Sequence, residues 1–304
     1  MKNLILLLIS TAVIFSCKKE EDPVILPNVD APDSSQIFEV NLGENYLIQA
    51  FVNIDDLEIV STNEKTVWDL GARFLNGVPH IFLNSSKNVK AVKVDNDFSE
   101  TISEQDLDLK WDKPDGKIEN FYIGNQLNKT FVITVGYNIS TRTDIYKKII
   151  VFKDGNSYKI KSADLDSQNE STISLSEIPE TEFVNFNLDQ FTGNQVYPED
   201  NKWDLLFSQY TTEFDDGSSY QVTGVLINTV VLNATRLSNN TTFKDVDIDF
   251  VQALDLTNDA DIIGYDWKEY FFEAGYYVVD TETVYILQKE NNFYKLRFVD
   301  FYDS

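Results

Sequence analysis

The sequence predicts an all-β protein built from antiparallel sheets. From residue 37 onward, short runs of β-forming residues follow one another, as in YLIQAFVNI and YQVTGVLI. Turn-forming pairs separate the runs, among them Asn76-Gly77, Asp154-Gly155 and Asp216-Gly217. No stretch of twelve or more residues carries a sustained apolar stripe at helical spacing. The alternating helices of a parallel α/β fold are therefore missing, and antiparallel pairing is the remaining solution.

The N-terminal segment is typical of an exported lipoprotein. Residues 1–16 have one lysine and then an apolar run too short for the ~20 residues of a membrane span, as in a signal peptide. The residues around Ser16-Cys17 resemble a bacterial lipobox, and Cys17 is the single cysteine of the chain. We expect Cys17 to carry palmitate and related acyl chains that attach the protein to a membrane.

Residues 17–34 are predicted to be a lipidated tether, since they hold three prolines and several charges but no periodicity. Their opening, Lys-Lys followed by three acidic residues, resembles the signal that sends some Bacteroidota lipoproteins to the outer face of the outer membrane. The expected location is therefore the outer membrane, lipid-anchored and facing the cell exterior.

Composition excludes one class of partner and one source of stability. The formal net charge is −25, with 50 acidic against 25 basic residues, so the chain lacks the clustered cations that nucleic-acid binding needs. One cysteine allows no intramolecular disulfide. With 42% hydrophobic residues the chain has the apolar content for a core, and stability must come from its burial.

The predicted strands follow in chain order, each a short apolar or alternating run. They are FEVNL (38–42), YLIQAFVNI (46–54), FVITV (131–135), KKIIVF (147–152), YQVTGVLI (220–227), TVYIL (283–287) and YKLRFVDF (294–301). One short helix is expected, from about Asp249 to Leu256.

Three echoes in the same order predict a tandem duplication. The predicted hairpin at 147–167 matches the one at 282–304 at an offset of 136 residues, and Trp68-Asp69 matches Trp203-Asp204 at 135. Further upstream, residues 38–42 match 184–188 at 146. We therefore expect a first β domain over 35–170 and a second over 180–304, each of ordinary size.

The order of these motifs resembles the HmuY family of Bacteroidota outer-membrane lipoproteins, whose best-studied member captures haem. The second copy fits best, with Trp203-Asp204-Leu205 at a strand start and the C-terminal hairpin. The resemblance implies two tandem HmuY-like β domains and non-catalytic binding. It further implies a ligand, haem or another nutrient, delivered to an outer-membrane receptor of the TonB-dependent kind. The alternative is a structural or adhesive module that binds glycan or protein.

The resemblance carries over no iron ligand. The haem-binding relative holds iron between two histidines, whereas this chain has His80 alone. His80 could still be a single axial ligand, or simply a histidine at the entry of a strand. Trp68, Asp69, Trp203 and Asp204 are best explained as structural anchors of the repeat, with buried rings and carboxylates that accept backbone N–H groups.

Other chemistry finds little support. Nucleophilic catalysis would rest on His80 alone, and no phosphate loop or zinc motif is present, so we expect no enzyme. Asp245, Asp247 and Asp249 alternate; on a strand they would share one face and could hold calcium, or simply be solvated. Dense aromatic stretches, at 269–280 and at Phe121-Tyr122, could stack on a ligand or dock a protein, though cores or an interior cleft should take most of the rings.

Overall fold

The computed structural model describes residues 35–302 except 176–181, 191, 238–240 and 274, and the side chains of 192–194 are also left out. The prediction of an all-β antiparallel protein is confirmed, because every strand pairing in this part of the chain is antiparallel. Cys17, the signal peptide and the tether lie outside the described residues. Within those residues no helix has the length and apolar character to cross a membrane.

The described strands are short to medium in length and follow in chain order. They are β1 (Ile48–Asn53), β2 (Glu58–Glu64), β3 (Leu70–Leu75), β4 (Val78–Leu83), β5 (Ala91–Val94), β6 (Thr130–Asn138), β7 (Thr143–Asp154), β8 (Ser157–Ala163), β9 (Ser171–Leu175), β10 (Val184–Asn187), β11 (Thr192–Asn194), β12 (Leu205–Glu213), β13 (Ser219–Ile227), β14 (Leu232–Arg236), β15 (Lys268–Phe271), β16 (Tyr276–Val279), β17 (Tyr285–Lys289) and β18 (Asn292–Leu296).

The helices are single turns. The α-helix α1 covers Ile248–Val251, and four 3₁₀ turns cover Glu44–Tyr46, Ser85–Lys87, Ile118–Asn120 and Asp200–Lys202. The helix expected over 249–256 is therefore present only as α1. Its N-terminus is fixed by Asp247, whose side chain accepts a hydrogen bond from the Phe250 N–H, and it ends after one turn.

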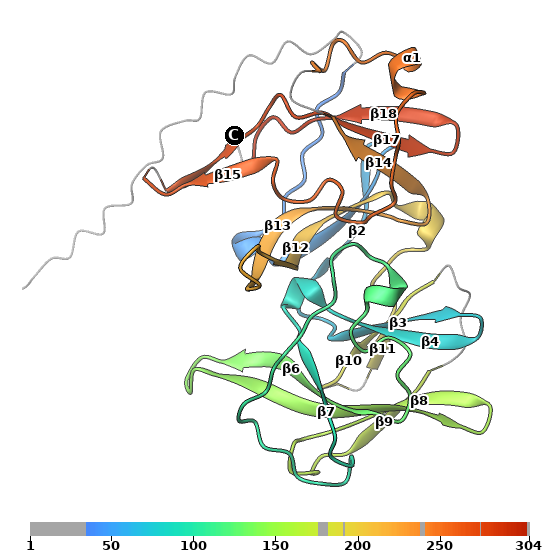
Figure 1. Cartoon of the computed structure of the whole chain (residues 1–304), viewed down its shortest axis with the longest axis vertical. Coiled ribbons are helices and arrows are strands. Elements are labelled where there is room, and N and C mark those ends of the chain that lie inside the picture. Colours follow the sequence, from blue (N-terminus) through green and yellow to red (C-terminus); the bar gives the residue numbers. More distant parts are fainter. Residues whose placement is uncertain (1–34, 176–181, 191, 238–240, 274, 303–304) are drawn as a thin grey trace, which may run out of the picture.

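The sheets form two bodies stacked along the long axis of the molecule (Figure 1). The lower body holds the sheets β11-β10-β3-β4 and β5-β6-β7-β8-β9, and the upper body holds β13-β12-β1-β2, β14-β17-β18 and the two-stranded sheet β15-β16. Each body has its own hydrophobic core. Ile133, Ile149 and Phe186 belong to the lower core, and Val52, Leu205 and Tyr285 to the upper one.

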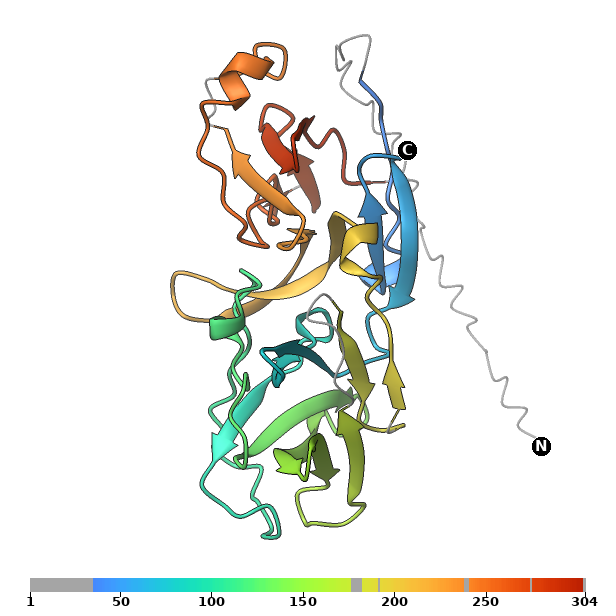
Figure 2. The same ribbon diagram turned by 90° about the vertical axis from the view of Figure 1, so that its right-hand side faces the viewer.

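Each body borrows a hairpin from the other half of the sequence. The β1–β2 hairpin lies in the upper body because β1 pairs with β12, and β10 lies in the lower body because it pairs with β3. Figures 1 and 2 show this exchange as the blue β1–β2 ribbon beside the gold β12 of the upper body, and the yellow-olive β10 and β11 beside the cyan β3 and β4. Both cores therefore draw residues from both predicted halves, 35–170 and 180–304.

Two of the three sequence echoes do not match structural counterparts. Residues 38–42 form no strand, so their match with 184–188 is wrong. The counterpart of β10 is β1: Asn53 and Asn187, at the ends of these strands, each accept hydrogen bonds from the N–H groups two and three residues further on. An apolar alternation of five residues is too common to identify one strand.

The two aligned hairpins, β7–β8 and β17–β18, also lie at different places in the repeat. β5 and β14 each follow a turn in which an asparagine carbonyl, of Asn84 or Asn228, accepts a backbone N–H at 3.0 Å. β5 then pairs with β6, and β14 pairs with β17. The counterpart of β17–β18 is therefore β6–β7. Any two hairpins with polar turns have similar sequences, and this general similarity explains why β7–β8 aligned with β17–β18.

The exchange predicts that the two halves stay associated after the chain is cleaved between them. A protease site placed within residues 176–181 would separate the halves covalently, but each would keep a hairpin in the sheet of the other. We expect the cut protein to elute as one particle in size-exclusion chromatography and to separate only in denaturant. Two particles eluting apart under native conditions would contradict the exchanged arrangement, and the uncut chain is the reference.

Candidate functional site

The two Trp-Asp steps occupy matching settings at the starts of β3 and β12. The Asp69 N–H donates to the Phe186 carbonyl at 2.7 Å, and the Asp204 N–H donates to Val52 at 2.8 Å. The Asp69 carboxylate accepts the Leu188 N–H at 2.8 Å, and that of Asp204 accepts the N–H of Ile54 at 2.9 Å. Every one of these partners belongs to an exchanged hairpin. The carboxylates thus hold the exchange in place.

Both carboxylates are fully buried and paired with an ammonium group. Lys87 lies 2.5 Å from the Asp69 carboxylate, and Lys289 lies 2.8 Å from that of Asp204. Burial raises the pKa of Asp69, and the Lys87 charge opposes that rise. The lysines come from different elements of the repeat, since Lys87 ends a 3₁₀ turn and Lys289 ends β17. The two buried carboxylates are therefore paired with lysines from non-equivalent positions.

The tryptophan rings meet at one tyrosine between the bodies. Trp68 and Trp203 are 2% and 5% exposed, and both rings pack edge-on against Tyr197, with centroids 6.0 and 5.9 Å away. The Trp68 indole N–H donates to the Gln49 side chain at 3.0 Å. With no open ring face, the Trp-Asp steps serve packing rather than ligand contact.

His80 lies on the strand pair β3–β4 of the lower body. It lies on β4 opposite Arg73 of β3, half-buried, and burial lowers the pKa of its imidazole. It lines neither of the two clefts described below. Ligation of iron by two histidines of this chain is excluded because there is no second imidazole, and His80 as a single axial ligand stays a prediction.

The three alternating aspartates do not share a strand face. Asp245 lies in a turn, where its carboxylate accepts the Thr242 hydroxyl, and Asp247 and Asp249 belong to the cap and first turn of α1. The strand geometry expected for a calcium site is therefore wrong. Within the described residues, no group of three or more histidine, cysteine or acidic side chains is placed to hold a metal ion.

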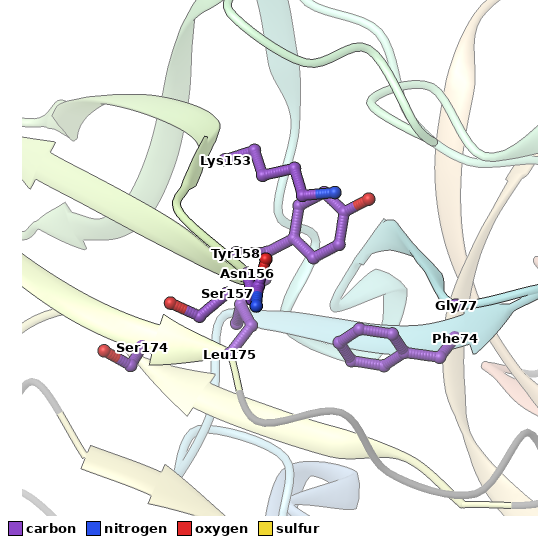
Figure 3. Close-up of a pocket in the computed structure, with 8 residues that line it drawn as sticks. All are labelled: Phe74, Gly77, Lys153, Asn156, Ser157, Tyr158, Ser174 and Leu175. Atoms are coloured by element: carbon purple, nitrogen blue, oxygen red, sulfur yellow. The ribbon is translucent and has the colours of Figure 1, made fainter.

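A first cleft opens in the lower body between β3, β8 and β9. It has a volume of about 340 Å³ and is lined by Phe74, Gly77, Lys153, Asn156, Ser157, Tyr158, Ser174 and Leu175. Figure 3 shows the Lys153 side chain folded over the Tyr158 ring, with its ammonium 5.4 Å from the ring centroid. The lysine therefore already covers the tyrosine ring, and hydroxyl and amide groups dominate the remaining wall.

A second cleft lies where the two bodies meet, and we call it the junction cleft. Its volume is about 480 Å³, and its lining comes from three separate segments: Trp111, Lys113, Pro114, Asp115, Thr212, Glu213, Phe214, Asp215 and Asp261. Aromatic rings and carboxylates therefore alternate around it. Burial raises the pKa of Asp261, and the nearby charges of Asp115 and Asp259 raise it further.

The most exposed apolar surface is the hairpin β15–β16, which we call the aromatic hairpin. Tyr270, Phe271, Phe272 and Tyr276 are 39%, 51%, 88% and 50% exposed. Their hairpin is a separate two-stranded sheet that projects from the upper body (Figure 1). Large exposed rings gathered in one place are rare on monomeric proteins and mark interaction surfaces.

The base of the aromatic hairpin is fixed by an aromatic cluster around Lys268. The Lys268 ammonium lies 4.1 Å from the Trp267 ring centroid and 4.7 Å from that of Phe301. The Tyr277 N–H donates to the Tyr302 hydroxyl at 2.7 Å, so the C-terminal segment covers the edge of β16. An isolated two-stranded hairpin is marginal in water, and these contacts supply the support it needs.

Comparisons of the chain with known protein families, with curated proteins and with solved structures found no match. The resemblance to the HmuY family therefore stays a prediction that rests on sequence motifs.

The sequence indicated a dense aromatic stretch at the aromatic hairpin, but most of its rings were expected to be buried in a core. Phe121 and Tyr122 do pack inward, against Phe82 and Phe131. The junction cleft was missed, because Trp111 and Phe214 lie about a hundred residues apart and only the meeting of the two bodies brings them together.

The buried carboxylates predict a large loss of stability on truncation. Asp204→Ala leaves the Ile54 N–H without its acceptor and removes a buried partner of Lys289, so we expect the free energy of unfolding to fall by about 3 kcal/mol. Asp204→Asn keeps an oxygen acceptor and should lose less. Asp55→Ala is the matched control: it removes the other, exposed partner of Lys289 and should cost under about 1 kcal/mol. Urea unfolding measures all three; equal losses for Asp204→Ala and Asp55→Ala would contradict the assignment.

Lys268 predicts a pH dependence of stability. Burial lowers the pKa of its amine from 10.5 to about 7, so between these values the unfolded chain binds more protons than the folded one. The free energy of unfolding should therefore rise with pH across this window. Lys268→Met should remove that rise, and from pH 7 to 9 the wild type should gain about 2 kcal/mol more than the variant in urea unfolding. Parallel pH curves would mean that the rings and carbonyls around the amine keep it charged.

Proposed function

We propose that this chain is a non-catalytic recognition protein of the bacterial cell surface, held by acyl chains on Cys17, and that the aromatic hairpin is where it binds a partner protein. The observation that carries the proposal is the exposure of Tyr270, Phe271, Phe272 and Tyr276 on one supported hairpin. The lipobox and the resemblance to HmuY-like outer-membrane lipoproteins support the location. Tyrosine and phenylalanine rings are the side chains that protein interfaces favour.

The ring geometry favours a protein over a glycan. Stacking on a sugar needs an open, flat ring face. Here Tyr270 packs edge-on against Phe272 and Tyr277, with interplanar angles of 87° and 65°. These rings present edges and corners, which fit the side-chain pockets of a protein surface. A glycan partner would require the rings to turn.

The negative charge of the hairpin and of the whole chain indicates that the partner surface carries positive charge. The hairpin carries Glu269 and Glu273 beside its rings, and the whole chain has a net charge of −25. A second copy of the chain would be repelled. The fitting partner has an apolar depression with basic residues around it, and an outer-membrane receptor of the TonB-dependent kind is the partner class that the resemblance implies.

The second candidate function is capture of a small nutrient for such a receptor. The junction cleft is the observation that favours it, because it combines ring faces with convergent polar groups. Haem is not the ligand that these residues favour, since His80 lies outside the cleft. The two candidates are compatible if the cleft holds the ligand while the hairpin contacts the receptor.

Photo-crosslinking in the native bacterium tests the proposal. A photoreactive phenylalanine analogue at position 272 should give one defined adduct with an outer-membrane protein. The same analogue at Tyr137, a ring 57% exposed on the β6–β7 hairpin, is the matched control and should not give that adduct. Cys17→Ser should release the chain from the membrane fraction and weaken the adduct.

Three outcomes would count against the proposal. Identical adducts from positions 272 and 137 would mean that exposure alone explains the crosslink. Absence of any protein adduct at 272, with glycan captured instead, would favour the adhesive glycan-binding alternative. A Cys17→Ser chain that stays in the membrane fraction would contradict the lipid anchor.

A further inference from the structure

We propose that the junction cleft binds a substituted ammonium group, that of a small quaternary amine or of a methylated lysine side chain. This inference does not depend on the aromatic hairpin. It rests on the ring faces, the carboxylates and the fixed geometry of the cleft.

Two rings line the cleft, each already covered on one side from outside it. Lys90 holds its ammonium 5.6 Å from the Trp111 ring centroid, and Tyr220 stacks on Phe214 with a centroid distance of 5.3 Å. Neither Lys90 nor Tyr220 lines the cleft. The Lys90 contact indicates that this indole accepts an ammonium group, and indole is the best aromatic partner for a cation.

Four acidic residues line the cleft, Asp115, Glu213, Asp215 and Asp261, against one lining lysine, Lys113. The Asp115 carboxylate already accepts the Lys117 N–H and the Asn120 amide, so the acidic side chains left for a ligand are the other three. Within the described residues, no hydrogen bond or ion pair occupies the side chains of Glu213, Asp215 or Lys113. A ligand with a positive charge would be attracted by the surplus of negative charge, and an anion would be repelled.

Contacts between the bodies keep the cleft in shape. The Ala260 N–H donates to the Asp115 carbonyl at 2.9 Å, Lys117 pairs with Asp259, and the Lys90 ammonium donates to the Ser219 hydroxyl at 2.8 Å. These bonds join the segments that carry the lining residues. A ligand would therefore meet a preformed site, with little ordering left to do on binding.

The residues of the cleft suit a bulky organic cation better than a metal ion. No set of three or more carboxylates here is close enough to coordinate one ion, whereas a bulky ammonium needs only diffuse negative charge and ring faces. A neutral sugar would use the rings but would gain nothing from the net charge. The test therefore compares an ammonium ligand with a metal ion and with a neutral sugar.

The test is titration of the full chain with choline, followed by tryptophan fluorescence and calorimetry. Trp111 is the partly exposed indole, while Trp68, Trp203 and Trp267 are buried, so its emission should report binding. A peptide with trimethyl-lysine forms a second arm and identifies the source of the ammonium group. Calcium, sodium and a methyl glycoside at matched ionic strength are the reference ligands.

Removal of negative charges and removal of a positive charge from the cleft should change the affinity for choline in opposite directions. Glu213→Gln with Asp215→Asn should weaken choline binding roughly fivefold or more, and Trp111→Phe should weaken it by less. Lys113→Gln should strengthen it, because it removes the ammonium group that lines the cleft. The matched control, Asp56→Asn with Asp95→Asn, removes two exposed charges outside the cleft and should leave the affinity within about twofold.

The proposal is overturned by saturable binding of calcium or the glycoside in place of choline, by no response to choline or the peptide, or by equal effects of the cleft and control pairs. Circular dichroism of each variant shows that it is folded. Since Lys113, Glu213 and Asp215 are exposed, their substitution leaves the cores untouched.

Discussion

The structure depends on two buried carboxylates that accept N–H groups from the opposite half of the chain. A carboxylate without solvent must be paired and hydrogen-bonded, because desolvation otherwise costs several kcal/mol. Asp69 and Asp204 find their ion-pair partners, Lys87 and Lys289, in their own halves. They accept backbone N–H groups from the exchanged hairpins, of Leu188 and Ile54, so the buried carboxylates lose part of their hydrogen bonding without the other half. Each body is completed by a hairpin from the other half of the chain, and this constraint holds the bodies in one fixed relation.

The fixed relation explains how the junction cleft forms. Trp111 precedes a turn of the first half, and Phe214 lies at the tip of β12–β13 in the second. They line one cleft because β12 is anchored by β1, while the Asp115 carbonyl bonds to the Ala260 N–H across the junction. Had each half folded as a separate domain on a flexible linker, no such cleft would have a defined shape.

How much of this the sequence predicts depends on how specific each signal is. Alternation and turn residues predicted the all-β class, since β periodicity survives any topology. The Trp-Asp steps were matched correctly because a buried ring beside a buried carboxylate is a rare combination. The exchange was invisible, because the groups that select the hairpin are backbone N–H groups of Ile54 and Leu188, which carry no side-chain signal. At residues 245–249 a side-chain signal was present but gave the wrong prediction. The alternation of aspartates suggested a strand, whereas Asp247 caps the start of a helix.

The aromatic hairpin lies in a segment where the two halves of the chain differ. Gly124 and Gly264 occupy matching positions, each bridged to the second strand of the second hairpin of its half, through Ile81 of β4 and Val225 of β13. Five residues lead from Gly124 to β6, whereas the route from Gly264 to β17 includes the aromatic hairpin. That insertion completes no sheet and holds neither exchanged hairpin. Its exposed rings belong to neither of the two main hydrophobic cores, and exposed rings gathered in one place are typical of interaction surfaces.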